Sequence, residues 1–392
     1  MSTFLAAAIV MAGPVVQHMP PPIMSYPRAP GPHAVPVERP QQQLGRWMMR
    51  PVFCAGMAPS DSAVQSVVRE PDPDRFLTWR RLQSQSQADM TLTLEFRIDA
   101  TGRPLSIRRR VVSEAKYVPD AEDVLPAFAA SRFAAGSERT GCQATFVVAA
   151  APIAEASVAD LMAYSLFPSG TPPKAVWDQI TPVGGNCTNP SPDVLLRAFP
   201  AFKTMPDQPG YRTWSMTGYD IDPSGKPRNV RTIGGSGTPT LDRASRDAIA
   251  GSRFERGART GCFYPYHKNA TILTAPTAPT EDEMRPAGTT CPHDHDWNQA
   301  PALIYPTRYR RRSIEGWAMI AYDVAPWGQT GNVRVLKAEP SAEFGDAAAA
   351  MIRNATLKTA GTGYIGCIDR VRYVMRKPGV PVQPGAPDAI VD

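Results

Sequence analysis

Alternating apolar and polar residues mark three β-hairpins along the chain. Residues 96–107 read FRIDATGRPLSI, residues 219–230 read YDIDPSGKPRNV and residues 322–333 read YDVAPWGQTGNV. Each segment has two alternating runs around turn-forming residues, which is the pattern of a hairpin with glycine in its turn. The same positions fall in register without gaps, namely Ile98, Ile221 and Val324; Gly102, Gly225 and Gly328; and Ile107, Val230 and Val333. The chain is therefore predicted to contain an internal repeat.

A helix is predicted after each hairpin. The three candidate helices cover residues 120–133, 238–254 and 341–357. Thr238, which precedes a proline, and Ser341 are suitable N-cap residues. Pro126 lies inside the first candidate helix and should kink or shorten it.

A final strand closes each unit. These strands are predicted at residues 142–149, 262–267 and 367–375. The unit is therefore β-β-α-β, and the predicted fold class is α+β, with a helix packed on a small antiparallel sheet. Three tandem modules are expected, at residues 51–152, 180–272 and 286–377.

The six cysteines follow the repeat. Cys142, Cys262 and Cys367 each open a final strand after a glycine, and Cys54, Cys187 and Cys291 each lie upstream of a hairpin. Six cysteines allow fifteen pairings in principle. The repeat selects one of them, which gives Cys54–Cys142, Cys187–Cys262 and Cys291–Cys367. Such disulfides indicate an oxidising compartment; free core cysteines are the alternative.

The N-terminus indicates export. Residues 4–11, FLAAAIVM, form an apolar run that is too short to span a bilayer and is typical of a signal peptide, predicted here at residues 1–12. No basic residue precedes the run, so the alternative is an inner-membrane anchor whose beginning lies upstream of Met1. The expected location is the periplasm.

Prolines are concentrated outside the predicted modules. The chain contains 42 prolines in 392 residues. Residues 13–50 are predicted to form a proline-rich linker, and residues 378–392 a disordered tail.

Charge gives little information about partners. The net charge is +6 and the isoelectric point is about 9.0, which a solvated surface of mixed charge explains. Nucleic-acid binding through the arginine runs at residues 108–110 and 307–312 is the alternative. The predicted export argues against it.

No catalytic motif stands out. The sequence lacks a Walker loop, a dinucleotide fingerprint, a nucleophile elbow and a His-Glu-x-x-His motif. The segment Cys291–Asp296, with His293 and His295, is the one local cluster of metal-ligand residue types. Cys291 belongs to the repeated cysteine pattern, so we expect a disulfide there, no metal, no cofactor, no small-molecule substrate and no enzymatic activity. A metal-binding protein or metal-dependent enzyme using His293 and His295 is the alternative.

The third module resembles the C-terminal domain of TonB. Residues 305–324 read YPTRYRRRSIEGWAMIAYDV, and residues 331–355 continue with a Val-Arg-Val strand, a Glu-Pro loop and an alanine-rich helix. The residues that carry this resemblance are Tyr305, Pro306, Gly316, Trp317 and Gly328. Residues 219–254 match less closely and residues 94–133 more weakly still.

The resemblance implies a function in the cell envelope. TonB C-terminal domains capture an extended peptide of an outer-membrane transporter, which adds as a strand to a sheet edge. The matching edge here is the last strand, with Ile368, Arg370, Arg372, Tyr373 and Val374 as candidate partner-binding residues. The expected function is that of an adaptor for an outer-membrane transporter or another envelope protein. The alternatives are that these charges only protect the edge from aggregation, and that the protein is purely structural.

Overall fold

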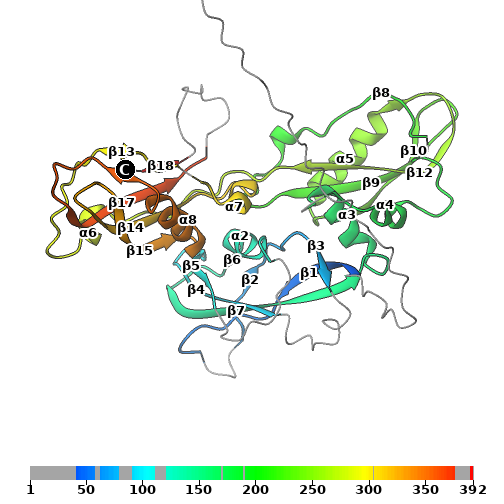
Figure 1. The fold of residues 1–392 in the computed structure, drawn as a ribbon. Coiled ribbons are helices and arrows are strands. Elements are labelled where there is room, and N and C mark those ends of the chain that lie inside the picture. Colours follow the sequence, from blue (N-terminus) through cyan, green and yellow to red (C-terminus); the bar gives the residue numbers. More distant parts are fainter. Residues whose placement is uncertain are drawn as a thin grey trace, which may run out of the picture. The chain divides into compact units, whose positions relative to one another are not determined.

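The computed structural model describes residues 41–57, 62–78, 91–110, 121–168, 171–188, 190–302, 304–375 and 389–391. The predicted signal peptide at residues 1–12 and residues 13–40 of the predicted linker lie outside this part of the chain. The described residues form an α+β structure of antiparallel sheets with a few helices and three disulfides (Figure 1).

The first sheet has five strands in the order β3-β1-β7-β4-β5. Its strands are β1 (Gln41–Met49), β3 (Asp74–Thr78), β4 (Thr91–Ile98), β5 (Pro104–Arg109) and β7 (Arg139–Pro152). Helix α2 (Val124–Ala130) follows the β4–β5 hairpin, and the short strand β6 (Arg132–Phe133) pairs with β2 (Ser66–Val67).

Strand β1 corrects the predicted linker, which extended to residue 50. Gln41–Met49 pairs with β7 along seven residue pairs. This segment contains no proline, so all of its N–H groups can join a sheet. Leu44 and Trp47 are both buried in hydrophobic cores. This burial stabilises the strand, although the residues before it are rich in proline.

The second sheet has three strands in the order β10-β9-β12. These strands are β9 (Thr213–Ile221), β10 (Pro227–Gly235) and β12 (Arg259–Lys268), with helix α5 (Pro239–Gly251) between the last two. Strand β11 (Arg253–Phe254) pairs with β8 (Val194–Leu196), and η2 (Phe202–Thr204) is a short 3-10 helix. Helices α3 (Val158–Leu166) and α4 (Lys174–Ile180) form a second core with Trp214 and Met216.

The third sheet has four strands in the order β15-β14-β17-β18. They are β14 (Gly316–Val324), β15 (Thr330–Glu339), β17 (Tyr364–Tyr373) and β18 (Ala389–Val391). The other elements are α6 (Glu281–Met284), α7 (Thr307–Arg311), α8 (Ala342–Ile352) and β13 (Trp297–Gln299), which pairs with β16 (Thr356–Leu357). Strand β18 lies within residues 378–392, where the sequence predicted a disordered tail.

Helices α5 and α8 pack along the hairpins that precede them, α5 on β9 and β10 and α8 on β14 and β15 (Figure 1). All three helices are shorter than predicted, and α2 has 7 residues. Pro126 is the third residue of α2, where its missing N–H costs no helical hydrogen bond. Helices α2 and α5 end at Ser131 and Ser252, whose backbones are extended. The residues that follow therefore form β6 and β11.

The turn glycines make a close contact that explains their presence in every hairpin. Gly102, Gly225 and Gly328 have φ values of +83°, +84° and +92°. A Cβ atom at Gly102 or Gly225 would overlap the carbonyl oxygen of Phe133 or Phe254, and one at Gly328 would overlap that of Leu357. Phe133, Phe254 and Leu357 each donate their backbone N–H to the carbonyl oxygen of the glycine that they contact, at 2.8–2.9 Å. Only glycine fits both the backbone conformation and the space.

The three disulfides join the pairs that the repeat pattern selects. They are Cys54–Cys142, Cys187–Cys262 and Cys291–Cys367. Each bond links the segment before a hairpin to the strand that ends the corresponding sheet. Cys142, Cys262 and Cys367 are all buried, so the bridges form part of the cores.

The third sheet is covered on both faces. Phe344 of α8 packs against Tyr373 on one face. On the other face, Ile368 and Trp317 form a cluster with Ala275, Ala278 and Met284. The Trp317 indole N–H donates to the carbonyl oxygen of Pro276 at 2.8 Å, which holds this cover against the sheet.

Candidate functional site

The predicted docking strand, β17, is a candidate site because, among the described residues, its edge opposite β14 is paired with another strand only at residues 371–373. Strand β14 pairs with one edge of β17, and β18 pairs with residues 371–373 on the other. Two carboxylates from neighbouring segments accept hydrogen bonds from the backbone of β17 and of the residues just after it. Glu281 accepts from the Arg370 N–H at 3.3 Å, and Glu315 accepts from the Met375 N–H at 2.8 Å.

The five candidate partner-binding side chains fall into two groups. Ile368 and Tyr373 are buried, at 2% and 0% exposure, and belong to the cores on opposite faces of the sheet. Arg370, Arg372 and Val374 are half-buried. Because alternate residues share a face, the two arginines lie on the same face as Ile368. A partner strand would therefore meet arginine side chains on one face of β17.

The residues of the TonB-like motif position β14 and β17. The Tyr305 hydroxyl donates to the Ile314 carbonyl oxygen at 2.7 Å, and its ring packs against Tyr373. Pro306 is the N-cap of α7. A Cβ atom at Gly316 would lie 2.7 Å from the Glu339 carbonyl oxygen. Together with Trp317 and Gly328, these residues hold β14 and β17 in position.

The basic stretch of the motif binds the first helix. Arg312 of the α7 C-cap is 1% exposed, and its guanidinium donates to both carboxylate oxygens of Asp123 at 2.7 and 2.5 Å. Arg308 pairs with Glu122. Burial disfavours the charge on Asp123, but Arg312 outweighs it and lowers the pKa of Asp123 below its usual value. Arg308 and Arg312 thus connect α7 to the residues that directly precede α2.

The residues of the Cys291–Asp296 segment have separate partners. Cys291 is in a disulfide. His293 is largely exposed and contacts Arg285 and Asp282. In the part of the chain that the structure describes, no three His, Cys, Asp or Glu side chains gather as a metal site requires. The side chains of this segment therefore do not gather around one point.

His295 forms a small buried polar cluster. Its Nε2 lies 3.3 Å from Asp369 of β17 and 3.1 Å from the Tyr322 hydroxyl, which itself donates to Asp369 at 2.6 Å. The Trp297 ring packs against both His295 and Tyr322. Hydrogen bonding to Asp369 raises the pKa of His295 above 6.5, against the opposing effect of burial. This cluster therefore links β17 to its neighbour β14 and to the segment that contains His295.

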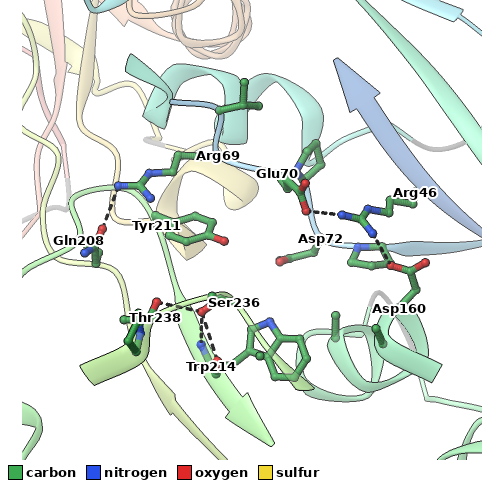
Figure 2. Close-up of a pocket in the computed structure, with 18 residues that line it drawn as sticks. Arg46, Arg69, Glu70, Asp72, Asp160, Gln208, Tyr211, Trp214, Ser236 and Thr238 are labelled. Carbon is green, nitrogen blue, oxygen red and sulfur yellow. Dashed lines mark hydrogen bonds and ion pairs between the residues drawn. The ribbon is translucent and has the colours of Figure 1, made fainter. Parts of the chain in front are cut away.

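A cavity of about 540 Å³ lies between the first and second sheets (Figure 2). Its charged groups largely pair with one another: Arg46 contacts both Glu70 and Asp160, and Asp72 pairs with Arg212. Tyr211, beneath Arg69, and Trp214 supply its aromatic wall. No sequence pattern indicated this cavity, because its lining residues come from five separate segments.

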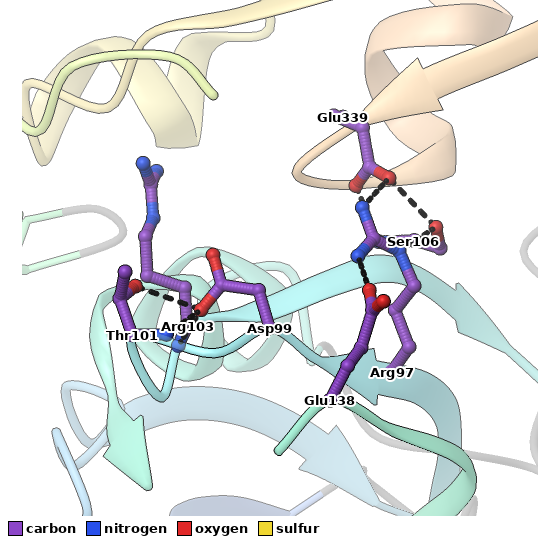
Figure 3. Close-up of polar contacts among 7 residues, drawn as sticks. All are labelled: Arg97, Asp99, Thr101, Arg103, Ser106, Glu138 and Glu339. Atoms are coloured by element: carbon purple, nitrogen blue, oxygen red, sulfur yellow. Dashed lines mark hydrogen bonds and ion pairs between the residues drawn. The ribbon is translucent and has the colours of Figure 1, made fainter. Parts of the chain in front are cut away.

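A second polar network joins the first and third sheets (Figure 3). Glu339, which is 1% exposed, accepts hydrogen bonds from the Ser106 N–H and hydroxyl and from Arg97 at 2.5–3.0 Å. The Ile107 N–H donates to the Pro340 carbonyl oxygen at 2.9 Å. Ser106 lies at a bulge with φ +51°, so its N–H points out of the β4–β5 hairpin. Sequence reasoning missed this contact as well.

The comparisons with known proteins agree with the architecture of the third sheet. Residues 301–367 match the profile of the Gram-negative bacterial TonB protein C-terminal family. The match spans α7, β14, β15, α8, β16 and the beginning of β17. No curated protein matches the chain. Among the described helices, none combines the length and apolar character needed to cross a membrane. The family match is consistent with a TonB-like role in protein binding in the cell envelope.

Proposed function

We propose that the protein is a periplasmic, non-enzymatic adaptor that binds an extended peptide of an outer-membrane transporter or another envelope protein. The peptide adds as a strand to the outer edge of β17. The observation that carries this proposal is the family match at residues 301–367, which ends on that strand. On this edge the Arg370 N–H bonds to a side chain, Glu281, and not to another strand. An added strand could accept that hydrogen bond instead, and main-chain hydrogen bonds supply much of the affinity in strand addition.

We also propose that the chain holds three copies of the β-β-α-β module. In support, each sheet has a hairpin with a turn glycine, a helix, a two-residue strand and a disulfide to the last strand. Asp220 and Asp323 are equivalent under this repeat, and each accepts hydrogen bonds from a bulge asparagine and from a glycine N–H of the last strand. Arg97 takes the corresponding place in the first sheet, where it contacts Glu339.

Site-specific cross-linking in the envelope tests the binding function. A photo-cross-linking amino acid in place of Arg372 should capture a partner, and the cross-linked peptide should be an extended segment of an outer-membrane transporter or another envelope protein. Mass spectrometry of the cross-linked product identifies it.

The matched control carries the same amino acid in place of Lys337, which is exposed on β15 at the opposite edge of the sheet. We expect no product there. Equal yields from residues 337 and 372, or no envelope protein cross-linked at residue 372, would contradict binding at the β17 edge.

A further inference from the structure

The outer edge of the last strand is closed in a different way in each sheet. In the first sheet, β1 pairs with β7 along seven residue pairs, and the next residue, Arg50, donates its N–H to Thr145 at 2.8 Å. In the second sheet, no described strand pairs with the outer edge of β12. Pro265 occupies the position three residues after the disulfide cysteine, where the first sheet has Thr145. A proline at an edge has no N–H to offer a partner.

The equivalent position in the third sheet is Arg370, and it keeps its N–H. That N–H points away from β14, because its acceptor is the carboxylate of Glu281. Residues 370 and 372 therefore share the outward direction, since hydrogen-bonding directions alternate along a strand. Strand β18 pairs with β17 in antiparallel register at residues 371–373, with Arg372 opposite Ile390.

From this comparison we propose that the β17 edge is autoinhibited. Strand β18 occupies the place of a partner strand, and Glu281 caps the neighbouring N–H, so a partner binds only by displacing β18. This inference rests on the proposed strand-addition function. The cover is shorter than the one on the first sheet: β18 makes three residue pairs, whereas β1 makes seven. The β17 edge is thus closed by the short strand β18, which a partner strand can replace. The β7 edge is closed by the longer strand β1.

The occupant also indicates the class of peptide that fits. Residues 388–392 read DAIVD, an apolar triplet with an acidic residue at each end. Arg370 and Arg372 supply positive charge along the receiving strand. The edge should therefore prefer an antiparallel, extended peptide with apolar residues between acidic ones. Such a peptide competes with a tethered segment whose effective concentration is on the order of millimolar, so the intact chain should bind it weakly.

The test uses the full chain and a probe taken from its own sequence. The probe is a fluorescent peptide with the sequence of residues 385–392, GAPDAIVD, and binding is followed by fluorescence anisotropy. Ile390→Pro removes the backbone N–H at the centre of β18. It should raise the affinity for the probe at least about tenfold over the wild-type chain. Amide hydrogen exchange at Arg372 should become faster in the same variant and slow again when the probe is added.

Val382→Pro is the matched control, because it introduces the same residue between the modules and β18 but outside the strand. It should bind the probe as the wild-type chain does. Affinities within twofold for all three proteins would overturn autoinhibition, and so would an Ile390→Pro chain that does not bind the probe.

The outcomes also separate this inference from the proposed function. If Ile390→Pro binds the probe but neither chain cross-links to an envelope protein through residue 372, the edge is autoinhibited and the adaptor function fails. If the wild-type and Ile390→Pro chains cross-link equally to a transporter and bind the probe equally, the adaptor function stands and autoinhibition fails.

Discussion

His295 and Arg312 are both held by acidic residues that lie far away in the sequence. Asp369 of β17 faces His295. Asp123, which is 189 residues from Arg312, accepts two hydrogen bonds from its guanidinium. Sequence patterns indicated what these residue types can do but not which partners they have. The cysteines were different, because their positions recur with the repeat and so identify their partners.

The buried cluster at His295 predicts a pH dependence of stability. The pKa of His295 is higher in the folded protein than in the unfolded chain. Its contribution to the free energy of unfolding is therefore full below pH about 6.5 and is lost as the pH rises through the folded value. His295→Gln should destabilise the protein more at pH 6 than at pH 9, as measured by urea denaturation.

The control for this prediction is His293→Gln, at a side chain that is 69% exposed. It should change stability little at either pH. A loss of stability in His295→Gln that is the same at both pH values would show that the residue acts through packing and not through its charge.

At the scale of elements, local patterns predicted the hairpins, the helices and the final strands, because these depend on periodicity and on turn residues. The two-residue strands β6, β11 and β16 were not predicted, because each depends on a distant partner strand and on the turn glycine. Strands β1 and β18 were missed for a related reason. Their proline-rich surroundings conceal segments that gain stability only by pairing with β7 and β17.

The contact at the turn glycines predicts an unequal response to the same substitution. Gly225→Ala should lower the free energy of unfolding by more than about 2 kcal/mol, because it combines an unfavourable φ with overlap against Phe254. Gly237→Ala has a similar φ of +70° but open space around the Cβ position, and it should cost about 1 kcal/mol. Chemical denaturation of both variants measures the difference. Equal losses would mean that the close approach to Phe254 contributes nothing.

At the scale of the whole molecule, buried polar contacts connect the sheets. Arg312 joins the third sheet's α7 to α2 of the first, and Glu339 joins β15 to the β4–β5 hairpin. Breaking a buried ion pair at one partner costs roughly 3–5 kcal/mol, because the other charge stays buried without a partner. These contacts were beyond sequence analysis, which treated the predicted modules as separate units.

Removing both connections should uncouple the sheets. We expect one main unfolding transition for the wild-type chain in differential scanning calorimetry. Arg312→Met combined with Glu339→Ala should separate it into two. Arg311→Met with Lys337→Ala, two exposed positions nearby, is the control and should keep the single transition. A double variant that unfolds in one transition at a lower temperature would show that other contacts suffice to couple the sheets.

The placement of the disulfides limits how the protein responds to mechanical pulling. The bridges span 88, 75 and 76 residues, so more than half of the chain lies within closed covalent loops. A force applied at two points outside the loops passes through the sulfur atoms and cannot extend the three glycine-turn hairpins or the helices α2, α5 and α8, which lie inside the loops. Only the segments between and beyond the loops can lengthen, at up to about 3.4 Å per residue. Under tension the three disulfide-closed loops would keep their length, and the molecule would lengthen only through the segments that join and flank them.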